Sequence, residues 1–142
     1  MINLEGNSNI PLNIGVVGSR TFSDKDLIFA WLNRVYKELG PFDKLVTGDS
    51  QGADLIAEAW AKKMEMDVKI CYADWTNLGT KASFLRNISI IDSSDFIVAF
   101  WDGDSNGTAH AIRVTRMTNK PLLVISKSGS NYELLSTVKF LD

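Results

Sequence analysis

Short runs of apolar residues alternate along this chain with longer stretches in which apolar residues recur at every third or fourth position. The short runs are rich in β-branched residues and end at glycine or polar residues, a pattern typical of buried strands. The longer stretches place their apolar residues on one face of a helix. The pattern predicts strands at 13–18, 43–47, 67–72, 95–101 and 121–126, and helices at 25–39, 52–66, 81–92 and 106–118.

Alternating strands and helices indicate right-handed crossovers between parallel strands. We therefore expect an α/β fold, a Rossmann-like doubly wound parallel sheet of about five strands with helices on both faces. Ser23 or Asp24 is the expected cap of the first helix, and residues 73–79 are expected to be irregular. Residues 1–12 are predicted to be a flexible arm before a single domain over 13–142, whose tail after Lys127 forms a loop and then a small helix or an edge strand.

The composition narrows the class of partner. With 142 residues, 45% of them hydrophobic and 23% charged, the chain is typical of a soluble globular domain. Fifteen Lys and Arg against 17 Asp and Glu give a net charge of −2, from which we expect no long nucleic acid as partner. The start of the chain lacks the pattern of a signal peptide, and the apolar run Phe96–Trp101 is too short to span a membrane, so we expect a cytoplasmic protein with no membrane partner.

Three predicted loops carry glycine and small polar residues to the carboxyl ends of strands, where open α/β sheets bind ligands. Glycine lets backbone N–H groups approach a ligand, hydroxyl groups add donors, and arginine pairs with phosphate. Ordinary turns with solvated side chains are the alternative. The predicted ligand-binding residues are Gly18, Ser19, Arg20 and Thr21 in the first loop, Gly48, Asp49, Ser50, Gly52 and Asp54 in the second, and Asp102, Gly103, Ser105, Gly107 and Thr108 in the third.

Two carboxylates in the second loop restrict what this loop can bind. The start of a helix favours an anion, but a carboxylate repels phosphate unless a cation intervenes. Asp49 is therefore expected to accept a hydrogen bond from a ribose hydroxyl or a base N–H, or to cap the helix, and Asp54 either contacts the ligand or stabilises the helix start. A divalent metal stays open as an accompanying ion, although one Cys and one His cannot form a zinc site by themselves.

Four further residues are candidates for the same crevice. Arg86, followed by Asn87, is expected to bind phosphate, the alternative being a solvated arginine. Trp75 is expected to stack on a ligand base or a partner chain, or else to cover the core. His110, the single histidine, either hydrogen-bonds a ligand and transfers protons or lies on a helix surface or interface. Together with the three loops, these residues point to a small-molecule ligand of nucleotide type.

Four segments of the chain resemble a known family. They are, in order, V-V-G-S-R-T-F, L-V-T-G-D-S-Q-G-A-D-L-I-A-E-A-W-A, A-D-W with K-A-S-F-L-R-N downstream, and D-F-I-V-A-F-W-D-G-D-S-N-G-T-A-H. This set resembles the YspA/YpsA-related branch (DUF2493-like) of the SLOG superfamily. The resemblance implies a Rossmann-like domain that binds nucleotides or nucleotide-derived ligands and has a place in signalling, stress or phage-conflict systems.

The same superfamily contains the LOG-type phosphoribohydrolases, which cleave the N-glycosidic bond of nucleoside monophosphates. Arg86 resembles their arginine and Asp102–Thr108 resembles their glycine loop, but Ala109, His110 and Ala111 stand where an acidic catalytic residue is expected. The resemblance therefore favours binding over catalysis. It also implies a homo-oligomer, because LOG-type relatives are dimers.

We accordingly expect a module that senses or sequesters a ligand of AMP, ADP-ribose or cyclic-nucleotide type, without a certain cofactor. The alternative is a nucleotide hydrolase of phosphoribohydrolase type, for which Arg86, His110 and Asp54 are the catalytic candidates. A subunit that acts mainly through protein contacts is a third hypothesis.

Overall fold

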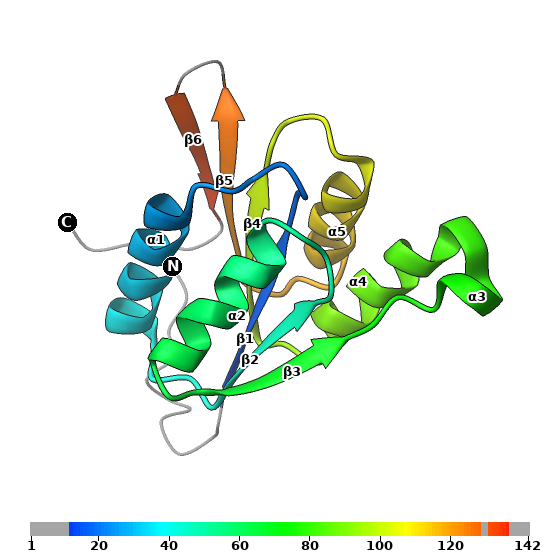
Figure 1. Cartoon of the computed structure of the whole chain (residues 1–142). Coiled ribbons are helices and arrows are strands. Elements are labelled where there is room, and N and C mark those ends of the chain that lie inside the picture. The colour runs from blue at the N-terminus through cyan, green and yellow to red at the C-terminus, as the bar shows by residue number, and fades with distance from the viewer. Residues whose placement is uncertain (1–11, 129–130, 137–142) are drawn as a thin grey trace.

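The computed structural model describes residues 12–128 and 131–136, which form one six-stranded sheet with helices packed on both faces (Figure 1). The strands are β1 (Asn13–Gly18), β2 (Lys44–Gly48), β3 (Asp67–Cys71), β4 (Phe96–Trp101), β5 (Leu122–Ser128) and β6 (Asn131–Ser136). The helices are α1 (Lys25–Leu39), α2 (Ala53–Lys63), α3 (Trp75–Leu78), the 3₁₀ turn η2 (Gly79–Lys81), α4 (Ala82–Asp92) and α5 (Asn106–Met117).

The strand order is β3-β2-β1-β4-β5-β6, with β1 to β5 parallel and β6 antiparallel to β5. The predicted Rossmann-like parallel sheet is thus confirmed, and the tail contributes an edge strand. The chain moves outward from β1 to β3 on one side, then crosses to β4 on the other. This reversal between β1 and β4 creates the switch point at which doubly wound sheets bind ligands.

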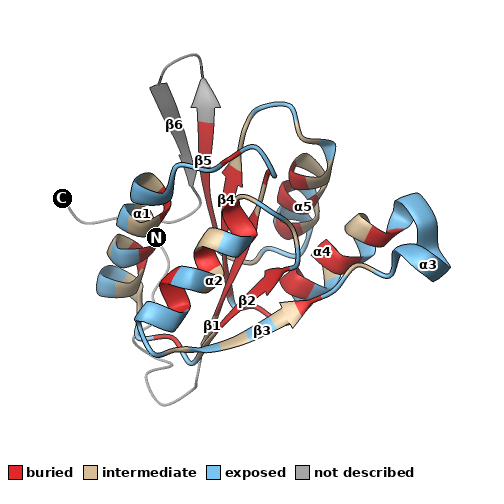
Figure 2. Ribbon diagram, in the orientation of Figure 1, coloured by how far each residue is buried: buried red, intermediate tan, exposed pale blue. Residues whose placement is uncertain are grey.

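The sheet separates two hydrophobic layers, because successive side chains of a strand point to opposite faces. On one face, fully buried Val16 belongs to the cluster formed with α1 and α2. On the other face, its neighbour Val17 belongs to the cluster formed with α4 and α5. Figure 2 shows buried residues concentrated where the helices meet the strands. No helix in the described part of the chain is long and apolar enough to cross a membrane.

Several element boundaries differ from the sequence prediction. The second helix ends at Lys63 rather than residue 66, because Glu65 adopts a left-handed backbone conformation with φ 58°. Residues 73–79 were expected to be irregular, but Trp75–Leu78 form α3 and Gly79 begins η2 (Gly79–Lys81). Of the two predicted caps, Asp24 begins α1 by accepting a hydrogen bond from the Leu27 amide at 3.1 Å.

The predicted arm over residues 1–12 falls mostly outside the described residues. Its last residue, Leu12, is described and packs against the core beneath α1 and α2. The Leu12 carbonyl also accepts a hydrogen bond from the Asp43 amide at 2.7 Å. Leu12 therefore belongs to the folded domain.

Candidate functional site

Glycines bring the three predicted loops together at the carboxyl edge of the sheet. Gly52 has φ 74°, and a Cβ added there would lie 2.6 Å from the Ser19 carbonyl and 2.5 Å from the Arg20 carbonyl. A Cβ on Gly18 would lie 2.4 Å from Cβ of Ala53 and 2.9 Å from the Phe100 carbonyl. Because real side chains do not fit at these distances, glycine permits the first loop to pack against the start of α2 and the end of β4.

Four hydroxyl side chains and one carboxylate from the first and third loops form what we call the hydroxyl cluster. Its members are Ser19, Thr21, Asp102, Ser105 and Thr108. Ser19 is 1% exposed, and its Oγ accepts a hydrogen bond from the Asp102 amide at 3.1 Å. Its Oγ also lies 3.3 Å from Oγ1 of Thr108, which lies 3.2 Å from Oγ of Ser105. The cluster fixes the first loop to the start of α5.

Asp102 holds the third loop in shape. Its Oδ1 accepts hydrogen bonds from the Asp104 amide at 2.9 Å and the Ser105 amide at 2.8 Å, and its Oδ2 accepts one from the Thr21 hydroxyl. Burial acts to raise the pKa of Asp102, but these hydrogen bonds outweigh it and hold the pKa below its ordinary value. Both oxygens of this carboxylate are therefore engaged, Oδ1 within the third loop and Oδ2 with the first loop.

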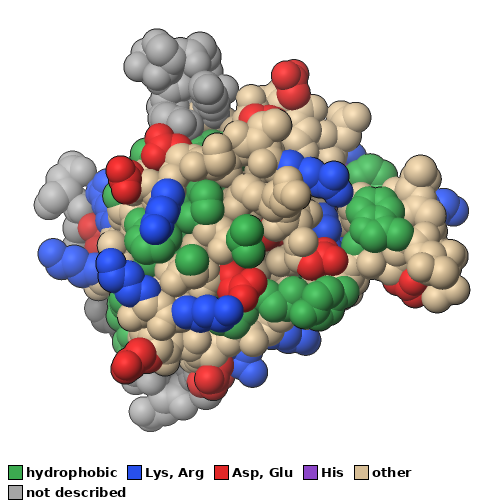
Figure 3. All heavy atoms as spheres, in the orientation of Figure 1, with side chains coloured by type: hydrophobic (Ala, Val, Ile, Leu, Met, Phe, Trp, Pro, Cys, Tyr) green, Lys and Arg blue, Asp and Glu red, His purple; other side chains and the backbone are tan. Residues whose placement is uncertain are grey.

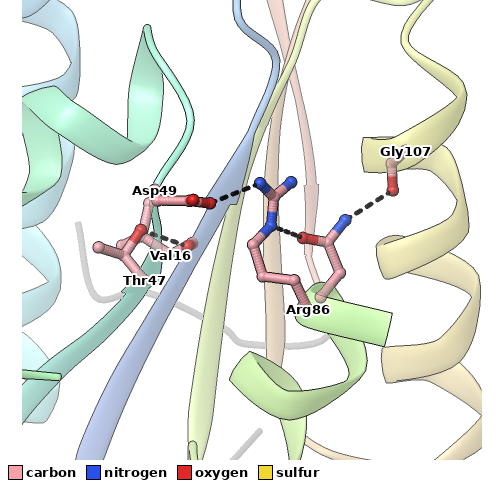
Figure 4. A network of polar contacts seen from close by, with 6 residues as sticks. Val16, Thr47, Asp49, Arg86 and Gly107 are labelled. Carbon is pink, nitrogen blue, oxygen red and sulfur yellow. Dashed lines mark hydrogen bonds and ion pairs between the residues drawn. The ribbon is translucent and has the colours of Figure 1, made fainter. Parts of the chain in front are cut away.

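Three ionisable side chains and one amide lie beside the hydroxyl cluster in what we call the charged cluster. Its members are Asp49, Asp54, Arg86 and Asn87. Nη1 of Arg86 donates to Oδ1 of Asp49 at 2.9 Å, and its Nε donates to Oδ1 of Asn87 at 3.3 Å. Nδ2 of Asn87 then donates to the Gly107 carbonyl at 3.2 Å (Figure 4). This chain of contacts links the second loop, α4 and the start of α5.

Asp54 is the most unusual residue of the charged cluster. It is 3% exposed, and its Oδ1 has no hydrogen-bond partner among the described residues. Burial raises its pKa from 3.8 to about 7, although Arg86 and the Ser50 amide act to lower it. The negative charge of Asp49 adds to the rise. Near neutral pH this carboxyl is thus divided between its charged form and its proton-donating form.

Thr47 contributes to the site, and the sequence prediction missed it. Its side chain is fully buried and donates to the Val16 carbonyl at 2.9 Å (Figure 4). The same hydroxyl lies within hydrogen-bonding reach of Asp54. Its polar contact with Asp54 acts to lower the pKa of that carboxyl, against the larger effect of burial. A threonine directly before the glycine that ends a strand was the available signal.

Arg20, Trp75 and His110 were predicted for the site but join neither cluster. The Arg20 side chain is exposed, and no ion pair to it is found within residues 12–128. Trp75 is 47% exposed on α3, which projects from the body of the molecule (Figure 1). The His110 ring packs against the Phe84 ring, with centroids 4.7 Å apart, and its Nδ1 is buried without a partner among the described residues. Gly103 lies exposed at φ 92°, where it permits the turn after Asp102.

Two features lie apart from these clusters. Cys71 is 8% exposed, and burial raises the pKa of its thiol, as is typical of a core cysteine rather than a nucleophile. A hollow of about 490 Å³ lies beside α5, where this helix meets β4 and β5, and Arg86 is not among its lining residues. It is lined by Trp101, Ala109, Ile112, Arg113, Arg116, Met117 and Val124.

The geometry suits recognition of an anionic group. A buried guanidinium, the uncapped start of α2 and a carboxyl that donates a proton when neutral are the groups that can contact a phosphate. At the neighbouring start of α5, a Cβ on Gly107 would meet only Nδ2 of Asn87, at 3.9 Å, so the backbone there is approachable. Among residues 12–128 and 131–136, no group of three or more His, Cys, Asp or Glu side chains could hold a metal ion.

Comparisons with known proteins agree with the fold and bear on the ligand class. Residues 13–77 match the model of the YspA, cpYpsA-related SLOG family. The Gene 61 protein of Mycobacterium phage D29 is 31% identical over 116 residues, which cover 76% of this chain and 91% of that protein. A solved structure of DNA processing protein A from Helicobacter pylori matches with a TM-score of 0.63 and 18% identity, covering 88% of this chain and 70% of that chain. The family match supports a nucleotide-related binding role, and the structural match shows the shared fold.

One sequence expectation is corrected by these matches. DNA processing protein A shares the fold and binds single-stranded DNA, so the exclusion of a long nucleic acid, which rested on the net charge of −2, is wrong. Net charge is a property of the whole surface and does not decide what one edge of a sheet binds. Acidic and basic side chains are in fact intermixed on the face shown in Figure 3. The homo-oligomer stays a prediction, which light scattering would test.

Proposed function

The chain belongs to the YspA, cpYpsA-related SLOG family, and from this premise we propose that it binds a nucleotide or nucleotide-derived ligand through a phosphate group at the charged cluster. The ligands that fit are of AMP, ADP-ribose or cyclic-nucleotide type. The hydroxyl cluster and the open backbone at Gly107 adjoin the charged cluster, and there they would meet the sugar or a second phosphate.

The observation that carries this proposal is the state of Arg86. Its side chain is 8% exposed, yet it forms a single ion pair in the described part of the chain, with Asp49. Its Nη2 makes no hydrogen bond to a described residue. Burying a guanidinium is costly unless its donors are satisfied, so a buried arginine with an unused Nη2 at a ligand-binding edge of the sheet is well suited to an anionic ligand.

A second candidate function, hydrolysis of the bound nucleotide, is favoured by Asp54 alone. Its pKa of about 7 suits a general acid that donates a proton to a departing group at neutral pH. In an N-glycosidic cleavage that group would be the base, while Arg86 held the phosphate. His110 is an unsuitable substitute, since its ring packs on Phe84.

The biological role that fits a small ligand-binding domain is that of a sensor or a sequestering module. We propose that it acts in the cytoplasm of a host cell during phage or bacterial conflict, with the phage relative as the support for that setting.

A thermal-shift panel tests binding, and mass spectrometry of the same mixtures tests hydrolysis. The panel holds AMP, ADP-ribose, a cyclic nucleotide, adenosine and a short single-stranded DNA. A ligand at 100 times its Kd should stabilise the fold by about 2.7 kcal/mol. We expect stabilisation by a phosphate-bearing ligand and none by adenosine. The absence of any shift at millimolar concentration would remove the binding proposal, and unchanged ligand masses with a positive shift would leave binding without hydrolysis.

A further inference from the structure

The anion site on Arg86 is already filled by a side chain of this chain. We propose that Asp49 holds the place of the ligand's phosphate and must leave Arg86 before the ligand binds, so that the second loop acts as a built-in competitor. This inference rests on the proposed function, since it concerns the same guanidinium.

The donors of Arg86 show that Asp49 or Asn87 already contacts each edge that could grip a phosphate. A guanidinium grips an oxyanion with two parallel hydrogen bonds, either from Nη1 and Nη2 or from Nε and Nη2. Asp49 occupies Nη1 and Asn87 occupies Nε. With both groups in place, a bidentate oxyanion would have to share either Nη1, one of whose two N–H groups already faces Asp49, or Nε, whose single N–H is donated to Asn87.

Of these two groups, Asp49 is the one able to leave. Asn87 is 6% exposed, and its amide is tied to the Gly107 carbonyl at 3.2 Å. The Asp49 side chain is 28% exposed, and its only hydrogen bond among the described residues is the one to Arg86. Asp49 also lies in the connection between β2 and α2 rather than within either element. Its departure opens the Nη1 and Nη2 edge for a bidentate phosphate.

The charges of the cluster favour exchange over joint occupation. Asp49 and Asp54 already face one guanidinium, and each carboxylate disfavours a further negative charge nearby. A phosphate entering while Asp49 remained would add its charge to that arrangement. When Asp49 moves out into solvent instead, the phosphate replaces a charge of the same sign. The buried, unpartnered Oδ1 of Asp54 stays behind as a group that a ligand donor or proton can satisfy.

The experiment compares Asp49→Asn with the parent chain by calorimetric titration with inorganic phosphate and with AMP. Asparagine keeps the shape of the side chain and an oxygen acceptor but removes the competing charge. We expect phosphate and AMP each to bind about five- to tenfold more tightly, the range for losing a partly exposed charge-assisted contact. Asp43→Asn is the matched control, because it removes the same charge from an exposed residue before β2, at the opposite edge of the sheet. Asp49→Ser is the second variant, should the asparagine variant fold poorly.

The direction in which the phosphate and AMP affinities change on Asp49→Asn decides whether Asp49 is a competitor. A loss of AMP affinity with unchanged phosphate affinity would mean that Asp49 accepts a hydrogen bond from the sugar or base, and it would overturn the proposal. Unchanged affinity for both probes would overturn it as well, since the competitor would then have no effect. If neither the parent nor the variants bind phosphate or AMP at millimolar concentration, the proposed function falls together with this inference.

Discussion

Asp54 of α2 and Arg86 of α4 meet over Gly48, the last residue of β2. A Cβ at Gly48 would lie 2.6 Å from Oδ2 of Asp54 and 3.1 Å from Nε of Arg86. The glycine therefore lets two oppositely charged side chains from separate helices approach the same point of the sheet edge. Burial nevertheless outweighs the attraction of Arg86 and leaves the pKa of Asp54 raised to about 7.

The first prediction concerns the pH dependence of stability. Because the pKa of Asp54 is raised from 3.8 to about 7 on folding, the folded state binds the proton more tightly than the unfolded state does. Its contribution to the free energy of unfolding is therefore present at low pH and is lost as the pH rises from about 4 to about 7, by on the order of 4 kcal/mol. Asp54→Asn removes this dependence.

Urea unfolding of the parent and of Asp54→Asn at several pH values measures this effect. We expect the asparagine variant to gain stability relative to the parent between acid and neutral pH. Two curves that stay parallel over this range would show that Asp54 ionises in the folded protein as it does in the unfolded chain.

A second prediction concerns the contact between the first two loops. In Gly52→Ala, the alanine would adopt φ 74° and its Cβ would lie 2.5 Å from the Arg20 carbonyl oxygen. We therefore expect a loss of about 3 kcal/mol or more in the free energy of unfolding. Gly79→Ala is the control, because Gly79 has φ 54° but no atom within 4 Å of the added Cβ. Its loss should be confined to backbone strain, about 1–2 kcal/mol. Equal losses in denaturant unfolding would argue against the close approach.

The third prediction separates Asp102 from its neighbour Asp104. Asp102→Asn removes the charge that organises the third loop and should cost about 1 kcal/mol of stability at neutral pH. Because the pKa of Asp102 is lowered on folding, its contribution is lost as the pH falls, and the difference from the parent should shrink in acid. Asp104→Asn, at an exposed position of the same loop, should leave the melting temperature unchanged. Similar melting temperatures for the two variants at neutral pH would contradict this role of Asp102.

Helices and strands with a regular repeat of apolar residues were predictable from the sequence. A helix of a single turn, and contacts between residues far apart in the chain, were not. The helix over 25–39 matches α1 because six apolar residues on one face repeat its period. The four-residue helix α3 escaped prediction, since a single turn has no period to detect. Asp102 was placed correctly in the third loop, but its part in holding that loop depends on Thr21, 81 positions away.

Most residues of the two clusters were among the predicted candidates, but the contacts between them were not predicted. Asp49 was expected to cap a helix or accept from a ligand, whereas it pairs with Arg86, 37 positions later. That contact depends on how β2 and α4 lie against each other, which no local pattern contains. The burial of Asp54 has the same origin, because a carboxylate in the first turn of a helix is ordinarily solvated. Arg86 was predicted as a phosphate ligand from its place near the sheet edge, and the likeness to an arginine of LOG-type proteins agreed, but its burial beside these carboxylates was not predicted.

The most direct test of the account is calorimetric titration of AMP and adenosine into the parent chain, Arg86→Gln and Arg113→Gln. Arg113 is an exposed arginine on α5, apart from both clusters, and so controls for the lost charge. If Arg86 holds the ligand phosphate, the parent and Arg113→Gln bind AMP more tightly than adenosine, and Arg86→Gln loses that preference, by about tenfold or more. An Arg86→Gln variant that folds and still prefers AMP over adenosine as strongly as the parent does would contradict it.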